Sequence, residues 1–377
     1  MKVLQAIHSY KPYIPYFEDK YYVNKEEITF DVLKKLLLKD RFYASHLLNP
    51  VLNDSENGFY TMWDYPLFQE KWAESKGWNE KDLKKILFAQ IEEFQPDVFY
   101  NFSPARFEPA EIKEGIADSI IKICWSAAPG INDEVFDIYK TRLTNLPSDI
   151  HSENKSGFRS DLFQPAHDPV MDQIKKETKK KEIDVFFYGQ YAPAHFKVRN
   201  KIIDQLIDYK IKSKFKIELA LSYTSKYKDD YLISRPYRLR KLFRTKKLTH
   251  PSKKVIKNGV SQLYGLDLYE KIASSRIVFN AAVDFSGEYK VNMRNFESLG
   301  LGAHLISDDG IYPEGFVKGT HLSVYSSFSD FVKTTEYMLN NKLESQKIVN
   351  EGNRMIRTKF SKEKQWERFQ EIVASVS

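Results

Sequence analysis

The segment "VNMRNFESLGLGAHLIS" (residues 291–307) places a cation and a carboxylate one helical turn apart. We expect a helix to begin near Asn292, with Arg294 and Glu297 on one face, because residues three apart are neighbours on a helix. The first turn of a helix attracts anions, and a carboxylate one turn later can accept both hydroxyls of a ribose. A local ion pair, worth roughly a few tenths of a kcal/mol, would explain the same spacing. The segment therefore indicates either a ligand site or a structural ion pair.

The elements around this segment alternate between apolar runs and helical patterns. Strands are predicted at residues 3–7, 41–48, 97–102 and 120–127 in the first half, and at 183–189, 215–222, 276–282, 303–308 and 321–327 in the second. Helices are predicted at 79–94, at about 195–209, from Asp267 with Glu270 in capping-box spacing, and from Ser361 to the end. Such alternation is typical of parallel strands joined by crossover helices.

The length of 377 residues exceeds what one hydrophobic core usually supports. The polar stretch "HSENKSGFRSDLFQPAHDPV" (residues 151–170) is typical of a linker, so a boundary is placed near residue 168. We predict an α/β protein with two Rossmann-like domains, 1–168 and 169–360, and a helix, 361–377, that packs back toward the first domain. In this architecture the carboxyl ends of both sets of strands face a cleft, where ligands bind.

Several classes of protein are disfavoured. The strand at 3–7 is not followed by GxGxxG, and no GxxxxGK[ST] is present, which argues against nicotinamide dehydrogenases and P-loop hydrolases. The chain has no apolar run of about 18 residues and no signal-peptide core, so a cytoplasmic protein is expected. The single cysteine, Cys124, lies in an apolar run and is expected to be a buried hydrophobe.

The net charge of +7 comes from one stretch, residues 235–257, which holds ten Lys/Arg and no acid. Leu239, Leu242 and Phe243 recur there at helical spacing, as in a helix that lies on anionic lipid. A solvated loop and a nucleic-acid site remain open alternatives, with nucleic acid the less favoured partner. The basic residues expected to contact an anionic membrane on its inner face are Arg238, Arg240, Lys241 and Arg244.

The region from Leu268 to Phe369 resembles the donor-binding domain of group-1 glycosyltransferases, which have the GT-B fold. It is most similar to the spore-maturation-protein-like branch, whose signature is an Asn-x-Arg-x-Phe-Glu helix before a small-residue turn and a strand. The resemblance implies that Glu297 binds the ribose of a nucleoside-diphosphate sugar and that Arg294 contacts its diphosphate or holds Glu297. Gly300 and Gly302 would let the backbone come close to the donor.

One position departs from the pattern of this family. Many retaining members carry two glutamates eight positions apart, whereas position 289 here is Tyr and Glu288 stands nine positions before Glu297. Glu288 is a predicted catalytic ligand of the sugar if a bulge restores the geometry. Whether the anomeric configuration is retained or inverted stays open.

Further candidates follow from the chemistry that a departing diphosphate requires. Arg199 and Lys290 are the predicted cations, Arg199 being open to interpretation as a solvated helix residue. Gln190, Tyr191 and Asn292 are predicted to line the donor pocket. On the acceptor side, the loop after residues 3–7 offers Tyr10, Glu18, Asp19 and His8, the last as a general base or as a structural histidine.

No metal cofactor is expected, because "SDDG" and "KDD" are not a strand-flanked Asp-x-Asp and the histidines show no paired spacing. The leading hypothesis is a glycosyltransferase that moves a sugar from a nucleoside-diphosphate sugar to a hydroxyl of a cell-surface glycan or lipid-linked acceptor. The alternatives are a nucleotide-sugar epimerase and a non-catalytic protein of the same fold that binds anions or nucleic acid.

Overall fold

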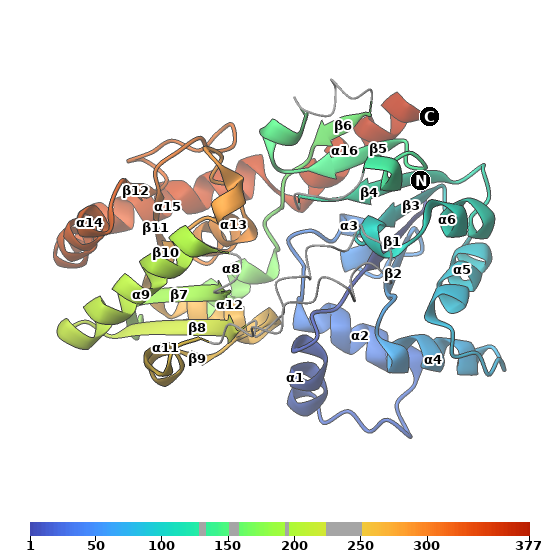
Figure 1. The fold of residues 1–377 in the computed structure, drawn as a ribbon, viewed down its shortest axis with the longest axis horizontal. Helices are drawn as coiled ribbons and strands as arrows, with labels where there is room; N and C mark the ends of the chain where they lie inside the picture. The colour runs from blue at the N-terminus through green and yellow to red at the C-terminus, as the bar shows by residue number, and fades with distance from the viewer. Residues whose placement is uncertain (128–132, 151–157, 193–195, 224–250) are drawn as a thin grey trace, which may run out of the picture. The chain divides into compact units, whose positions relative to one another are not determined.

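The computed structural model describes residues 1–127, 133–150, 158–192, 196–223 and 251–377. The chain forms two compact units, one made of residues 1–164 and 363–377 and the other of residues 165–362 (Figure 1). Each unit is built around its own six-stranded parallel sheet. Among the helices described, none is long and apolar enough to cross a membrane.

The sheet of the first unit has the strand order β2-β1-β3-β4-β5-β6. Its strands are β1 (Val3–Ile7), β2 (Gly58–Met62), β3 (Val98–Asn101), β4 (Ile121–Trp125), β5 (Thr141–Thr144) and β6 (Ser160–Leu162). Its α-helices include α1 (Tyr13–Lys20), α2 (Phe30–Asp40), α3 (Asn49–Leu52), α4 (Pro66–Ser75), α5 (Leu83–Phe94) and α6 (Pro109–Gly115). The sequence order reverses at β1, which lies between β2 and β3.

The last helix, α16 (Lys362–Val376), packs on the first unit. The Phe369 ring lies 5.1 Å from that of Tyr100 and 6.0 Å from that of Phe163, measured between centroids. Gln365 donates from Nε2 to the backbone oxygens of Ser45 (3.0 Å) and Gln164 (3.1 Å). The end of the chain is thus part of the core of the unit in which the chain begins.

The sheet of the second unit has the order β12-β11-β10-β7-β8-β9. Its strands are β7 (Ile183–Tyr191), β8 (Ile217–Tyr223), β9 (Val260–Ser261), β10 (Ser275–Asn280), β11 (His304–Asp308) and β12 (Ser323–Tyr325). Its α-helices include α8 (Val170–Glu177), α9 (Lys197–Lys212), α11 (Lys253–Asn258), α12 (Gly265–Ala273), α13 (Met293–Gly300), α14 (Phe328–Asn340) and α15 (Lys342–Lys359). The predicted α/β class with two Rossmann-like domains is confirmed.

Strand β7 shows why the second unit folds as it does. Val185 and Phe187 belong to the core on one face of the sheet, and Phe186 and Tyr188 to the core on the other. Successive side chains of a strand point to opposite faces, so a strand covered by helices on both sides must be apolar throughout. Each such side chain stabilises the fold by about 1.5 to 3 kcal/mol relative to exposure.

Several predicted elements are wrong in detail. Residues 41–48 form turns instead of a strand, because α2 ends at Asp40 and the backbone turns through left-handed conformations at Arg41 (φ 67°) and Tyr43 (φ 60°). Strand β6 lies inside the predicted linker 151–170, and β2, β5 and β9 were not predicted. Helix α12 begins at Gly265, so Asp267 lies in its first turn instead of capping it.

Candidate functional site

Polar side chains gather where the strands of the second unit end. The side chain of Asn280, the last residue of β10, is wholly buried. Its Oδ1 accepts hydrogen bonds from Arg294 Nη1 and from Asn292 Nδ2 (3.2 Å). Its Nδ2 donates to Asn295 Oδ1 (3.1 Å) and Ser307 Oγ (2.8 Å). One amide therefore holds the start of α13 against the ends of β10 and β11.

Two guanidinium groups meet beside Gly189, near the end of β7. A Cβ atom on Gly189 would lie 2.2 Å from Arg199 Nη2 and 2.7 Å from Arg294 Nη2, and the backbone there has φ of +147°. Arg294 donates to the Tyr188 carbonyl, and its Cζ lies 4.6 Å from the centre of the Tyr188 ring. Arg199 lies over Phe187 at 5.7 Å. Glycine is required here because any side chain would occupy the space of both cations.

Among the described residues, no acid forms an ion pair with either buried arginine. Arg199 is 5% exposed and Arg294 8%, neither forms an ion pair with a described acid, and the Nε of each lacks a hydrogen-bond partner. Burial, together with Arg294, lowers the pKa of Arg199 to about 9. Burial also lowers the pKa of Arg294. Buried cations that are not paired are costly, so this arrangement favours an anionic ligand.

The acids closest in sequence to the site have other partners. Asp284 accepts from the backbone N–H groups of Val198 (2.9 Å) and Arg199 (3.0 Å) at the start of α9. Asp308 accepts from Ala282 N (3.1 Å) and pairs with Lys290 Nζ (3.1 Å). Lys290, predicted to bind the diphosphate, is therefore neutralised by a carboxylate of its own unit.

Glu297 is buried on α13 and is only 4% exposed. Its Oε2 accepts a hydrogen bond of 2.6 Å from the Tyr188 hydroxyl, and burial raises its pKa. The alternative of a local Arg294–Glu297 ion pair is wrong, since Arg294 donates to Asn280 and to the Tyr188 carbonyl instead. Arg199 is likewise not a solvated helix residue.

The remaining donor-side candidates are placed less centrally. Tyr191 is buried, and its hydroxyl donates to Asp204 (3.1 Å), while Gln190 is half-buried beside it on β7. Glu288 is exposed. A Cβ on Gly300 would lie 2.6 Å from Met171 Sδ, and Gly302, with φ of +69°, lies against Lys175, so both glycines permit packing on α8.

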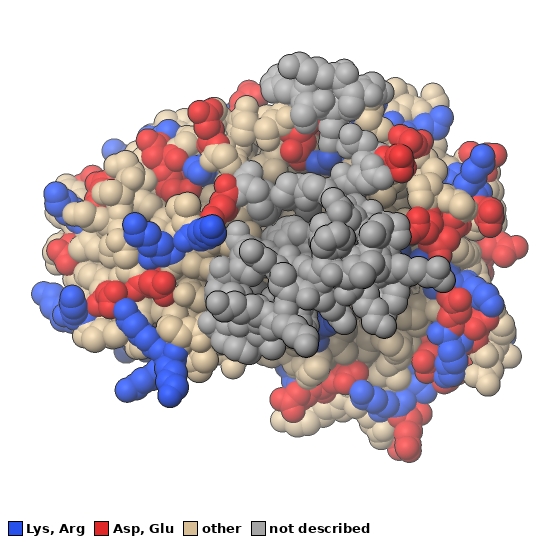
Figure 2. Space-filling view, viewed as in Figure 1, with Lys and Arg blue, Asp and Glu red and all other residues tan. Residues whose placement is uncertain are grey.

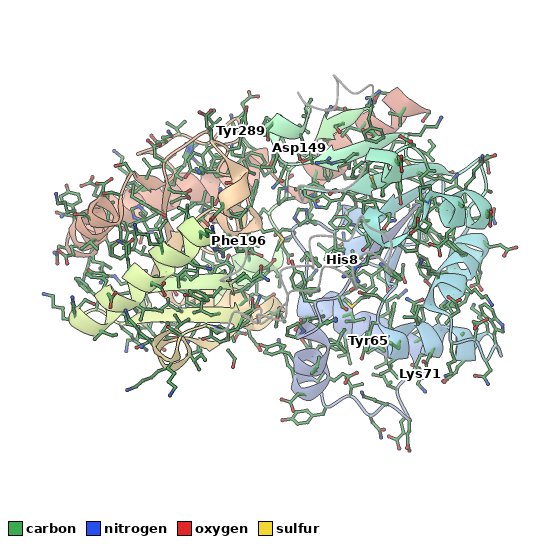
Figure 3. The ribbon with its side chains drawn as sticks, in the orientation of Figure 1. His8, Tyr65, Lys71, Asp149, Phe196 and Tyr289 are labelled. Carbon is green, nitrogen blue, oxygen red and sulfur yellow. The ribbon has the colours of Figure 1, made fainter. Side chains whose placement is uncertain are left out.

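A second polar group lies at the strand ends of the first unit, where the strand order reverses. His8 follows β1 (Figure 3), and its Nδ1 lies 2.9 Å from Ser103 Oγ, just after β3. Trp63 Nε1 donates to the same hydroxyl (3.2 Å). Asp64 accepts from Ser9 N (2.7 Å) and pairs with Arg106 (2.7 Å). Reversal points of open parallel sheets are where ligands bind.

Aromatic rings surround His8. The Tyr43 ring lies 5.9 Å from that of His8 and 5.5 Å from that of Tyr10, which is 44% exposed. The backbone of Tyr43 is left-handed (φ 60°), which is strained for a tyrosine, and such strain is concentrated at functional sites. Of the predicted acceptor acids, Asp19 is exposed, and Glu18 is held by the Tyr65 hydroxyl (2.9 Å) and Lys25 (2.8 Å).

Residues 240–371 match the model of a family described as glycosyl transferase-like. No curated protein matches the chain. Among solved structures, it is similar to Anabaena HepE in complex with UDP-glucose, with a TM-score of 0.57 and 10% identity over 100% of both chains. It is also similar to a variant of S. aureus TarM in complex with fondaparinux, alpha-GlcNAc-glycerol and UDP, with a TM-score of 0.51 and 10% identity over 78% of this chain and 59% of that one.

This chain has the GT-B fold. In GT-B terms, the second unit is the C-terminal domain, and Arg199, Gly189 and Arg294 lie at the carboxyl ends of its strands.

Sequence reasoning missed Asn280, Tyr188 and Ser103. The signal for Asn280 and Ser103 was a polar residue at or just after the end of an apolar strand.

The predicted membrane contacts Arg238, Arg240, Lys241 and Arg244 lie outside the described residues. In the part of the chain that the structure describes, no group of three or more His, Cys, Asp or Glu side chains could hold a metal ion. The expectation that the protein needs no metal stays a prediction.

Gly189→Ala is expected to displace Arg199 or Arg294 and to abolish the binding of an anionic ligand at this site, as measured by calorimetry. Gly319→Ala is the matched control, because Gly319 also has a positive φ (+77°) but has no neighbour within 4 Å of its Cβ position. It should reproduce only the backbone strain. Equal anion affinity in both variants would contradict the role of Gly189.

The His8 environment predicts a dependence of stability on pH. Burial, and secondarily Arg106, lowers the pKa of His8 from 6.5 to about 4. The unfolded chain therefore binds a proton that the folded chain excludes, and stability falls as pH decreases from about 6.5 toward 4. His8→Gln should lower the number of protons taken up on unfolding in this pH range by up to about one. An unchanged slope of unfolding free energy against pH would contradict this.

Proposed function

We propose that the protein is a glycosyltransferase that moves a sugar from a nucleoside-diphosphate sugar to a hydroxyl group. The observation that carries the proposal is the pair of buried, unpaired arginines, Arg199 and Arg294, beside Gly189. A diphosphate supplies the negative charge that this pair lacks. Guanidinium groups suit phosphate oxygens because they can donate two parallel hydrogen bonds.

The same pair would assist the reaction. When the acceptor oxygen bonds to the anomeric carbon, the bond from that carbon to the β-phosphate oxygen breaks, and a nucleoside diphosphate leaves with both electrons. Negative charge then grows on the phosphate, and fixed cations in a site of low dielectric stabilise it without reorganisation. Arg294 is held in place by Asn280, and both arginines lie over the ring of Phe187.

Glu297 is proposed to bind the ribose. Its position on the same helix as Arg294, three residues later, allows one helix to contact both the diphosphate and the sugar of the nucleoside. Ribose hydroxyls would donate to the carboxylate alongside the Tyr188 hydroxyl. Uridine is the base we favour, because the structures of HepE and TarM contain UDP. The Asn-x-Arg-x-Phe-Glu helix further supports placing the chain in the spore-maturation-protein-like branch.

The acceptor is proposed to bind the first unit around His8. With a pKa of about 4, His8 is neutral at pH 7 and can accept a hydrogen bond from an acceptor hydroxyl, although that pKa makes it a weak general base for an inverting reaction. In a retaining reaction the departing phosphate oxygen takes that proton. Tyr10 and Tyr43 offer rings on which a sugar can stack, which supports a cell-surface glycan or a lipid-linked sugar as acceptor.

The first test is a thermal-shift panel of UDP, GDP, dTDP, CMP and ADP with their sugar forms. UDP should raise the Tm of the wild type, since a ligand that binds only the folded state stabilises it.

Glu297→Gln should weaken UDP binding by about 1 to 3 kcal/mol in calorimetry. The apoprotein should become more stable near neutral pH, because the raised pKa of Glu297 means that its ionisation opposes folding. If no nucleotide shifts Tm, the proposed function fails.

A second test separates the diphosphate from the nucleoside. Arg199→Met should weaken the binding of UDP about 10-fold to 100-fold, because charge-assisted hydrogen bonds are lost, and it should leave the binding of uridine unchanged. Lys201→Met is the matched control, because Lys201 is an exposed cation on the same helix. Equal losses for UDP and uridine, or a comparable loss in the control, would exclude Arg199 as a diphosphate ligand.

A further inference from the structure

A second feature of the C-terminal domain lies apart from the arginine pair. Three apolar side chains are exposed on neighbouring elements: Ile211 (59%) at the end of α9, Ile256 (53%) on α11 and Val260 (44%) on β9. Helix α11 packs on α9 through the buried Val255. We call these three side chains and the lysines around them the α9–α11 surface.

A hydrogen bond and an ion pair hold α9 and α11 side by side. Lys210 Nζ donates to the Asn258 carbonyl (2.8 Å), and Lys254 pairs with Asp208 (2.5 Å). On α11, Lys253, Ile256 and Lys257 share one face because they are three and four residues apart. The exposed residues of both helices therefore belong to one rigid part of the domain.

Lysine is the commonest charged residue of this surface. Residues 208–216 and 252–261 hold seven lysines and a single acid, Asp208, which Lys254 neutralises. Glu218, on the neighbouring strand β8, pairs with Lys271 (2.7 Å) and with Lys216 (3.7 Å). Figure 2 shows Lys and Arg side chains that project over the region of α11. Lys212, Lys214, Lys253 and Lys257 are exposed.

We propose that the α9–α11 surface docks on an anionic lipid bilayer. Isoleucine and valine side chains surrounded by lysines match the boundary of a membrane, where apolar groups enter the acyl region and ammonium groups reach the lipid phosphates. A nucleic acid would use the lysines but would not require three exposed aliphatic side chains. The surface is independent of the arginine pair, so this proposal does not rest on the proposed function.

The test measures co-sedimentation of the full chain with vesicles of phosphatidylcholine, with and without phosphatidylglycerol. The wild type should bind only the anionic vesicles. The variant Lys253→Glu/Ile256→Asp should bind them at least about tenfold more weakly, since each basic residue near the surface adds attraction. The matched control is Lys342→Glu/Leu343→Asp on α15, where Leu343 is 90% exposed next to a lysine, and it should bind as the wild type does.

Ile256→Ser alone distinguishes lipid from other anionic partners, because it removes an apolar group and no charge. It should weaken vesicle binding and leave the Tm of the free protein unchanged, which shows that the domain is folded. The proposal is overturned if the wild type does not bind anionic vesicles or if the double variant binds as well as the wild type. It is also overturned if Ile256→Ser has no effect, which would indicate a purely electrostatic site such as one for nucleic acid.

Discussion

The arginine pair at Gly189 depends on the burial of two like charges next to each other. Arg199 and Arg294 approach because residue 189 has no side chain, and they stay in place because Asn280 and the Tyr188 carbonyl accept from Arg294 while aromatic rings lie beneath both. Buried cations that are not paired destabilise a fold unless a ligand compensates them. The domain thus gives up stability in the free protein at the site proposed to bind an anion.

The cost of this site is met by ordinary packing around it. The strand that carries Gly189 is apolar on both faces, and α13 is buried along most of its length. Glu297 adds a third buried ionisable group, held by one tyrosine hydroxyl. The ligand contacts proposed for Glu297 and Arg199 and the stability of the free protein are therefore opposed, whereas the lysines of the α9–α11 surface are exposed and cost the fold little.

Much of the fold was predictable because the spacing of apolar residues in the sequence follows the pattern of buried side chains. Strands β1, β3, β4, β7, β8, β10, β11 and β12 coincide with apolar runs, and Arg294 and Glu297 were predicted from helical spacing. The errors are equally physical. Residues 41–48 contain β-favouring side chains, yet a left-handed turn at Arg41 after α2 prevents a strand, and sequence patterns do not report such a conformation. The pairing of Lys290 with Asp308 was not predicted, because it joins residues that are distant in sequence.

By itself the sequence determined the class of fold, the presence of two parallel-sheet domains and the helix that carries Arg294 and Glu297, because these depend on local periodicity and spacing. Only the tertiary structure decided which cations are free for a ligand. Arg199 and Lys290 look alike in the sequence, but Lys290 meets Asp308, whereas Arg199 meets another arginine across a glycine. Charge pairing depends on which strand ends lie side by side, and the order of strands in the sheet sets that.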